Sequence, residues 1–366
     1  MLRDLDRRDT RILKGIAISA IVFHNFFRLT TTLRGNEFSF SPSRFGLFLA
    51  TAANPPLAVQ AFFTFFGHYG VNVFIFLSAY GLSRSRWDDT SSWANFMWGR
   101  VRKLYPVFGV AVIPWLICMS YYLGPLKVIK QTMPGIVCMF LGVSTLAGFG
   151  LPTIAPWWFI PFILQFYAIW PLLRRLTVKF GWPGLLILSA SSMVLTHAAD
   201  PVLAHWSMNL LLTPIGHLPE LCFGIAAARF PLRFNGYLAV SALAVALLGS
   251  FMAAVWPLTF FATLLLFLWL YLKLRGTLRS LGVVGWIGSC SPFMFLINGI
   301  VRLPFLPLAT SPAAQLFFGC ASATATLGIS AFLREFFVPT RRWAEKRQST
   351  LVTYHSPTDR LSVAGD

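Results

Sequence analysis

The chain has 366 residues, of which 56% are hydrophobic and 11% are charged, and its formal net charge is +18. A soluble domain carries about 25% charged residues, so this composition excludes a soluble protein and predicts an integral membrane protein. The positive charge would suggest a nucleic-acid partner in a soluble chain. Here the Lys and Arg residues form short clusters between hydrophobic runs, which is typical of loop charges that set membrane topology. We therefore expect a lipid bilayer and no nucleic acid as a partner.

Hydrophobic stretches long enough for a membrane helix, roughly 20 residues, recur along the whole chain. The first follows a charged N-terminus and has no small-residue cleavage site, so we expect a retained span and not a signal peptide. The stretches cover residues 12–28, 62–83, 104–123, 133–151, 156–174, 182–198, 209–228, 236–252, 254–272, 284–303 and 312–334.

The charges of the loops indicate which of these stretches does not cross the membrane. Lys and Arg residues favour cytoplasmic loops. Basic loops at 84–103, 174–179, 228–233 and 273–279 should therefore be cytoplasmic, and the loops 197–206 and 307–312, which have no Lys or Arg, should be outside. All of them fit if the glycine-rich stretch 133–151 enters the membrane without crossing.

The predicted fold is therefore an all-α, polytopic transmembrane helix bundle of about ten spans plus one re-entrant or non-spanning segment. The basic N-terminus and the basic segment 341–347 then both lie in the cytoplasm. Residues 1–340 form the membrane domain. Residues 341–366 are polar and poor in aromatic residues, so we expect a disordered cytoplasmic tail.

A few polar residues interrupt the predicted spans. His24 lies in the run "GIAISAIVFHNFFRL" (15–29), and Glu220 in "HLPELCFG" is the one acidic residue well inside a predicted span. Charged groups cost about 2.5–3.5 kcal/mol at a helix centre, so ionisable residues in spans are functional candidates. Asn72, Gln165 and Asn298 are weaker candidates, because amides in membrane bundles also form hydrogen bonds between helices.

Two further groups of residues have alternative interpretations. The arginines after the second span either anchor the loop at lipid headgroups or form an anion pocket, since guanidinium groups bind phosphate with two hydrogen bonds. The five cysteines stand singly in hydrophobic runs, so we expect packing residues and no metal site. The arginines are Arg84, Arg86, Arg100 and Arg102, and the cysteines are Cys118, Cys138, Cys222, Cys290 and Cys320.

Six segments, in order and at suitable spacings, resemble motifs of the acyltransferase-3 family, which are integral membrane enzymes that acylate cell-surface sugars and glycans. The resemblance extends over residues 10–335. The segments are "ILKGIAISAIVFHN" (12–25), "GVNVFIFLSAYGLSRSR" (70–86), "RKLYP" (102–106), "WFIPFILQFYAIWPLL" (158–173), "LPELCFG" (218–224) and "IGSCSPFMFLIN" (287–298).

The chain departs from the family pattern at several positions. The family usually has ten residues between a basic residue and an essential histidine, but nine separate Lys14 from His24. These two side chains are therefore about 80° apart on a helix, and Asn25 lies in line with Lys14. At other positions the residues of the family pattern are replaced in this chain. Ile163 and Leu164 stand in place of acidic residues, Asn298 in place of a late histidine, and Asn72 in place of a frequent aspartate. Glu220 is left as the carboxylate expected to orient or charge-pair with His24.

The resemblance implies an O-acyltransferase that moves an acyl group, most often acetyl, from cytoplasmic acetyl-CoA to a hydroxyl of an exopolysaccharide or other surface glycan, including lipid-linked forms. The implied location is the bacterial inner membrane, and other glycan-assembly proteins are candidate partners. His24 would act as a base or carry the acyl group covalently. Lys14, Asn25 and Glu220 would support it, the four arginines would hold the CoA, and the sugar would contact Trp158, Gln165, Tyr167, Asn72 and Asn298. The alternative for the aromatic residues near 157–167 is an interfacial belt.

Two other functions remain open from the sequence. A transporter or flippase of a lipid-linked sugar would use the same polar interior residues, although the internal symmetry of many transporters is not detectable here. A structural subunit of a glycan-assembly complex, derived from a degenerate acyltransferase, would explain the replaced carboxylates and Asn298.

Overall fold

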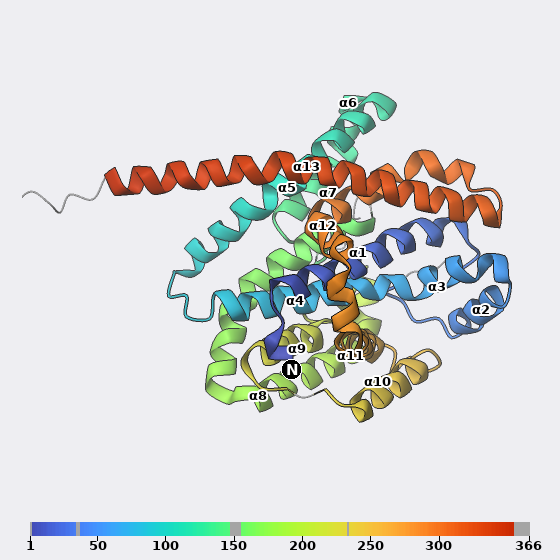
Figure 1. Ribbon diagram of the computed structural model, residues 1–366, viewed down its shortest axis with the longest axis horizontal. Helices are drawn as coiled ribbons and strands as arrows, with labels where there is room; N and C mark the ends of the chain where they lie inside the picture. Colours follow the sequence, from blue (N-terminus) through green and yellow to red (C-terminus); the bar gives the residue numbers. More distant parts are fainter. Residues whose placement is uncertain (1, 34–36, 147–154, 233, 355–366) are drawn as a thin grey trace, which may run out of the picture.

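All regular structure in residues 2–33, 37–146, 155–232 and 234–354, which the computed structural model describes, is helical (Figure 1). This confirms the predicted all-α class. The α-helices are α1 (Arg7–Thr30), α2 (Ser43–Ala52), α3 (Ala58–Phe66), α4 (Gly70–Ser85), α5 (Trp93–Leu123), α6 (Pro125–Gln131), α7 (Met133–Phe140), α8 (Phe159–His205), α9 (Leu218–Arg229), α10 (Gly236–Gly249), α11 (Leu258–Ser280), α12 (Gly282–Val301) and α13 (Pro312–Tyr354). Short 3-10 helices include η1 (Leu2–Asp4), η3 (Gly67–Tyr69) and η4 (Ala155–Trp158).

Seven helical stretches among the described residues are long and hydrophobic enough to cross a membrane. The protein is therefore an integral membrane protein, while the count of about ten spans stays a prediction. The seven stretches are Arg7–Thr30, Pro55–Ser85, Trp93–Leu123, Pro156–Leu203, Leu258–Ser280, Gly282–Val301 and Pro312–Phe337.

The difference between seven and ten has three local causes. The 48-residue stretch Pro156–Leu203 contains two of the predicted spans, 156–174 and 182–198, joined without a loop. Gly181 adopts a positive φ of 62° inside α8, a conformation that glycine tolerates without steric cost, so the chain bends there. The predicted spans 209–228 and 236–252 correspond to α9 and α10, which have only 12 and 14 residues.

Three other segments differ in detail from the sequence-based expectations. Helix α7 occupies only eight residues of the stretch 133–151, too few to cross a bilayer, and residues 147–151 lie outside the described part. Helix α2 was not predicted. The tail expected to be disordered from residue 341 begins as a helical continuation of α13, which ends at Tyr354; residues 355–366 lie outside the described part.

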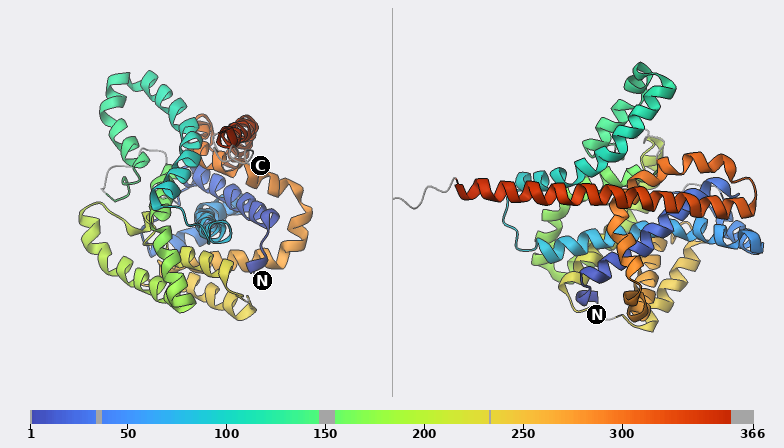
Figure 2. Two further views of the ribbon diagram at one scale, coloured as in Figure 1. Left: turned by 90° about the vertical axis from the view of Figure 1, so that its left-hand side faces the viewer. Right: turned by 45° about the horizontal axis from the view of Figure 1, so that its top comes forward.

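Helix α1 lies in the middle of the bundle, between α12, α3, α4 and α13 (Figure 2). Helix α12 makes the most extensive contact with it. The two backbones meet at glycines: a Cβ on Gly15 would lie 2.0 Å from the carbonyl oxygen of Val284, and one on Gly288 would lie 1.8 Å from that of Arg11. Small residues at a helix crossing allow such close packing in membranes.

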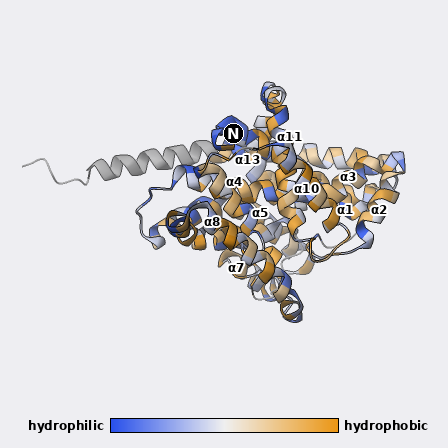
Figure 3. Cartoon of the chain, turned by 90° about the horizontal axis from the view of Figure 1, so that it is seen from below, coloured by the Kyte–Doolittle hydropathy of each residue, from blue (hydrophilic) through white to orange (hydrophobic). Residues whose placement is uncertain are grey.

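Hydrophobic residues dominate the helices, whereas hydrophilic residues gather around the N-terminus (Figure 3). The side where α1 begins is called the N-terminal end of the bundle below, and the side where α1 ends is called the far end. Helix α4 runs opposite to α1, because Gly70 packs on Ala17 while Tyr80 donates a hydrogen bond to the carbonyl of Leu5. Helices α5, α6 and α7 form an arm that projects from the bundle (Figure 1).

A buried carboxylate joins α1 to α11 at the N-terminal end. Asp9 is fully buried and accepts hydrogen bonds from Tyr271 at 2.6 Å and from the guanidinium groups of Arg275 and Arg279. Its Oδ2 also accepts the backbone N–H of Asp6, which completes a capping box at the start of α1. Both carboxylate oxygens of Asp9 are therefore paired, as a buried charge requires.

Candidate active site

His24 lies in the second half of α1 and is 2% exposed. Its ring is placed by η3, which packs directly on α1: a Cβ on Gly67 would lie 2.5 Å from the carbonyl oxygen of Ala20 and 2.7 Å from Cβ of His24. The glycine at this position therefore lets the chain between α3 and α4 approach the histidine. The ring of His68 from the same segment lies beside it, with 5.3 Å between the ring centroids.

The hydrogen bonds of His24 determine its tautomer. Nδ1 lies 3.1 Å from the carbonyl oxygen of Thr64 and 3.3 Å from that of Phe63. Carbonyl oxygens only accept hydrogen bonds, so Nδ1 carries the proton and Nε2 of the neutral ring has its lone pair free. Nε2 is buried and has no hydrogen-bond partner among the described residues. The arrangement leaves a basic nitrogen available for chemistry.

His24 lines a small cavity at the centre of the bundle, called the His24 cavity below. Two more histidines, two amides, one carboxylate and several aromatic rings complete its wall. Asn72, one of the predicted sugar contacts, lines it and donates a hydrogen bond of 2.7 Å to the carbonyl of Phe260. The other lining residues used below are His68, His217, Asn25, Glu37, Trp158 and Phe295.

The sequence suggested that Glu220 pairs with His24, but in the structure it pairs with His217. Its Oε1 lies 3.4 Å from Nδ1 of His217, and both side chains are 1% exposed. Nε2 of His217 lies 2.9 Å from the carbonyl oxygen of Leu211 and therefore donates to it. Glu220 does not reach His24 because His217, which lines the His24 cavity, lies next to the carboxylate. Glu220 thus holds the His217 ring at the cavity wall.

The carboxylate that does face His24 is Glu37, from the segment between α1 and α2. Glu37 lines the His24 cavity and forms an ion pair with Arg28 at the end of α1. Burial raises the pKa of the Glu37 carboxyl, but the neighbouring His24 and the positive charge of Arg28 outweigh it and hold the pKa below its usual value of 4.5. Glu37 is therefore a carboxylate at neutral pH.

Lys14 lies in a second and much larger cavity, toward the N-terminal end of the bundle. This Lys14 cavity also has Arg100 and Tyr167 in its wall, together with small residues of α4 (Ser78, Gly81 and Ser85). The guanidinium of Arg100 lies over the rings of Phe96 and Tyr167, at 5.1 and 5.5 Å from their centroids. Two cations therefore line a cavity whose other residues are mostly hydrophobic, with a few hydroxyl groups.

Phe295 of α12 lines both cavities. Its ring centroid lies 5.3 Å from that of Phe159 and 6.2 Å from that of Phe74. Phe295 itself is 7% exposed. The three rings, one each from α12, α8 and α4, thus form an aromatic constriction between the Lys14 cavity and the His24 cavity.

The four predicted CoA-binding arginines do not converge on one pocket. Arg100 alone among them lines the Lys14 cavity. Arg84, Arg86 and Arg102 are exposed at the same end of the bundle, and Arg86 forms an ion pair with Asp89 at 3.1 Å. Arg174, which the sequence analysis did not single out, holds this loop by donating hydrogen bonds to the carbonyls of Trp87 and Asp89.

Asn25 and Asn298 form a polar link between α1 and α12. The Asn25 amide donates a hydrogen bond of 3.0 Å to Oδ1 of Asn298, whose own amide donates to the carbonyls of Met294 and Phe295. Arg302, just beyond α12, donates a 2.6 Å hydrogen bond to the carbonyl of Asn25. Asn298 therefore holds the backbone that carries Phe295, and it is buried outside the wall of the His24 cavity.

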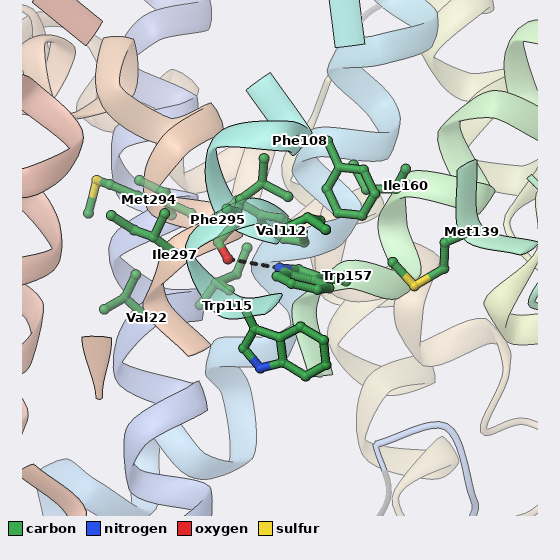
Figure 4. Packing of buried hydrophobic residues seen from close by; sticks show 14 of the residues in the cluster. Val22, Phe108, Val112, Trp115, Met139, Trp157, Ile160, Met294, Phe295 and Ile297 are labelled. Carbon is green, nitrogen blue, oxygen red and sulfur yellow. Dashed lines mark hydrogen bonds between the residues drawn. The ribbon is translucent and has the colours of Figure 1, made fainter. Parts of the chain in front are cut away.

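The predicted aromatic sugar site is divided among different environments. Trp158 lines the His24 cavity, but Tyr167 lines the Lys14 cavity. Gln165 donates hydrogen bonds to Gly142 and Thr145 and so ties α8 to the turn after α7. Trp157 is fully buried and donates a hydrogen bond to the carbonyl of Leu296, next to the rings of Phe108 and Trp115 (Figure 4). Trp157 is thus a packing residue of the wall and not an interfacial residue.

Sequence reasoning missed three titratable residues of the site, namely His68, His217 and Glu37. The two histidines lie in the predicted spans 62–83 and 209–228, so the criterion that selected His24 also applies to them. Glu37 gives no such signal, because it belongs to a polar segment between helices.

These features define a class of protein: a membrane-embedded helix bundle with a free basic imidazole in a central cavity, adjoining a larger cavity that contains cationic side chains. The family model of the acyltransferase domain (acyltransferase-3) matches residues 8–335, nearly the whole chain. The chain therefore belongs to the acyltransferase-3 family and is a membrane acyltransferase. No curated protein and no solved structure matches the chain.

Proposed function

We propose that this protein transfers an acetyl group from acetyl-CoA to a sugar hydroxyl of an exopolysaccharide or another surface glycan, including lipid-linked glycans. The proposal includes a bacterial inner membrane location with both termini in the cytoplasm. The N-terminal end of the bundle then faces the compartment that contains acetyl-CoA, and the far end faces the glycan. The observation that carries the proposal is His24, whose Nε2 is left free beside the aromatic constriction.

The Lys14 cavity suits the donor. CoA carries several phosphate charges, and Lys14 and Arg100 supply positive charge in the wall, while exposed Arg84, Arg86 and Arg102 surround the same end of the bundle. The hydrophobic part of the wall suits the uncharged arm of CoA. An acetyl thioester at the inner end of this cavity would lie at the aromatic constriction, with His24 on its other side.

His24 suits the role of general base. A sugar hydroxyl is a poor nucleophile at neutral pH, and a positioned base contributes typically 10²–10⁴-fold to the rate. Nε2 would take the proton of the sugar hydroxyl while the hydroxyl oxygen attacks the thioester carbonyl carbon. The C–S bond then breaks, and the CoA thiolate takes the proton from His24. Covalent transfer through an acetylated Nε2 uses the same nitrogen as nucleophile.

Purified protein in lipid nanodiscs, incubated with acetyl-CoA labelled in the acetyl group and with octyl glucoside and octyl glucuronide as acceptor sugars, tests this function. We expect the wild type to release CoA and His24→Ala to release none above background. His197→Ala is the matched control, because His197 is exposed on α8 and should retain full activity. CoA release by His24→Ala at the wild-type rate would contradict the role of His24. Absence of release by the folded wild type would overturn the acetyltransferase proposal and favour a transporter of lipid-linked sugars.

A further inference from the structure

The far end of the bundle contains three arginines close to residues of the His24 cavity, although the predicted outer loops 197–206 and 307–312 have no Lys or Arg. Arg28 lies at the end of α1, Arg44 in α2, and Arg302 directly after α12. In the predicted topology this end is outside, where the positive-inside rule disfavours Lys and Arg. Membrane topology therefore does not explain these three positive charges, and a function for them must be sought in the site.

Arg44 lines a third and small cavity, with room for a single charged group, called the Arg44 pocket below. His68 lies in the wall of both this pocket and the His24 cavity, so the two spaces are separated by one side chain. The remaining wall combines hydroxyl groups with aromatic rings: Ser39, Ser41, Ser250, Thr259, Tyr69 and Trp256.

The wall of the Arg44 pocket has the chemistry of a sugar site. Hydroxyl groups donate and accept hydrogen bonds, and an indole ring offers a flat hydrophobic face. The Tyr69 hydroxyl lies 3.4 Å from Oγ1 of Thr259, which donates to the carbonyl of Trp256 at 2.6 Å. These bonds fix the wall, and the guanidinium of Arg44 lies over the ring of Phe65, 5.9 Å from its centroid.

The local charge at this end is positive. Glu37 is the sole carboxylate in the walls of the His24 cavity and the Arg44 pocket, as far as the described residues show. Two arginines face it, because it pairs with Arg28 and also lies within electrostatic range of Arg44. One carboxylate for two guanidinium groups leaves an excess positive charge, and a guanidinium is well suited to bind a carboxylate or phosphate with two hydrogen bonds.

We propose that the acceptor is an anionic sugar, whose carboxylate or phosphate group binds Arg44 in the Arg44 pocket while a neighbouring hydroxyl reaches His24 past His68. This inference rests on the proposed function and deepens it, because it specifies the chemical class of the acceptor. It also gives the far-end arginines a role that membrane topology does not supply.

Binding of matched glycosides tests the proposal. Octyl glucoside and octyl glucuronide differ only in a CH₂OH or carboxylate group at C6, and octyl glucoside 6-phosphate adds the phosphate case. Affinities are measured by equilibrium dialysis with labelled glycosides, on protein in nanodiscs of phosphatidylcholine. We expect wild type to bind an anionic glycoside about tenfold or more tightly than the neutral one. Arg44→Gln should lose this preference, and Arg44→Lys should retain part of it. Lys127→Gln removes an exposed charge from α6 and should change nothing.

Each outcome decides the proposal. Equal affinity for the three glycosides in wild type, no binding of any of them, or a preference that persists in Arg44→Gln would overturn it. Nanodiscs that contain phosphatidylglycerol distinguish the source of the anion: if this lipid displaces the glucuronide, the pocket binds a lipid headgroup and the sugar assignment is wrong. Donor turnover is measured separately as CoA release. Loss of the glycoside preference with intact CoA release rejects the anionic acceptor alone, whereas an intact preference without CoA release rejects the acetyltransferase.

Discussion

Lys14 and His24 stand on one helix but line different cavities. His24 follows Lys14 by ten positions, which corresponds to a rise of about 15 Å along the helix. Phe295 lies in the wall of both cavities. The basic residue and the histidine therefore act on different parts of the bound reactants in the proposed reaction. Their 80° offset around the helix is no obstacle to function, because they need not touch.

Substitution of Lys14 should impair donor binding more than chemistry. We expect Lys14→Met, which keeps the length and removes the charge, to raise KM for acetyl-CoA by roughly tenfold with a small change in kcat, since a lost charged contact costs about 1.5–3 kcal/mol. Steady-state CoA release over a range of acetyl-CoA concentrations measures both constants. Lys130→Gln, at an exposed position of α6, is the control. An unchanged KM in Lys14→Met would place the CoA phosphates elsewhere.

Truncation of Phe295 should widen the passage between the two cavities. We expect Phe295→Ala to accept butyryl-CoA and hexanoyl-CoA with a higher kcat/KM relative to acetyl-CoA than wild type does. Phe293→Ala is the matched control, because Phe293 is a buried ring of the same helix that lines neither cavity. Both variants lose about 3–5 kcal/mol of packing, so only a change specific to Phe295 reports on the constriction. Identical acyl-chain profiles for the two variants would contradict this role.

Neutralisation of Asp9 should destabilise the bundle strongly. Asp9→Asn removes the charge that three donors from α11 share and leaves Arg275 and Arg279 without their common partner. Hydrogen bonds to charged groups contribute about 1.5–3 kcal/mol, and we expect a loss of stability of this size in thermal unfolding in detergent. Asp88→Asn, at an exposed position, should lie close to wild type. Equal midpoints for the two variants would show that the cluster contributes little.

The Glu37 carboxylate predicts a pH dependence of stability. The pKa of Glu37 is lower in the folded protein than its usual value of 4.5, so the carboxylate stabilises the fold above that pH. The contribution decreases as the pH falls through the folded-state pKa. We expect wild type to unfold at a higher temperature than Glu37→Gln at about pH 7, and the difference to decrease as the pH falls below 4.5 and through the lowered pKa of the folded state. Asp200→Asn, which is exposed, should show no such pH-dependent difference; a constant difference for Glu37→Gln at all pH values would contradict the assignment.

The sequence predicted the all-α bundle because, in lipid, a long hydrophobic run can pair its backbone N–H and C=O groups within itself only as a helix. It did not predict how the runs would be joined. Gly181 lies between two runs that read as separate spans, and in α8 the two helical parts meet directly at a kink at this one residue, without a loop. The helicity of residues 341–354 was also missed, since that segment lacks the hydrophobic pattern from which a helix is normally inferred.

The site was predictable to the extent that its residues lie on hydrophobic helices. His24 could be found because an imidazole is costly in a membrane span, and His68 and His217 carried the same signal. The partners of these rings depend on tertiary structure. Glu220 follows His217 by three positions, so the pair is local, whereas Glu37 belongs to a polar segment between helices and lines the cavity only through tertiary structure. A pattern along the chain cannot distinguish these two situations.

The glycine contact between α1 and α12 bears on how the constriction could widen. Since a Cβ at Gly15 or Gly288 would overlap a backbone carbonyl, the two helices are in direct backbone contact where they cross. His24 and Phe295 therefore lie on one closely packed pair of helices, whereas the rings of Phe74 and Phe159 belong to other helices. We expect the constriction to widen by displacement of α4 or α8 against this pair and not by separation of α1 from α12.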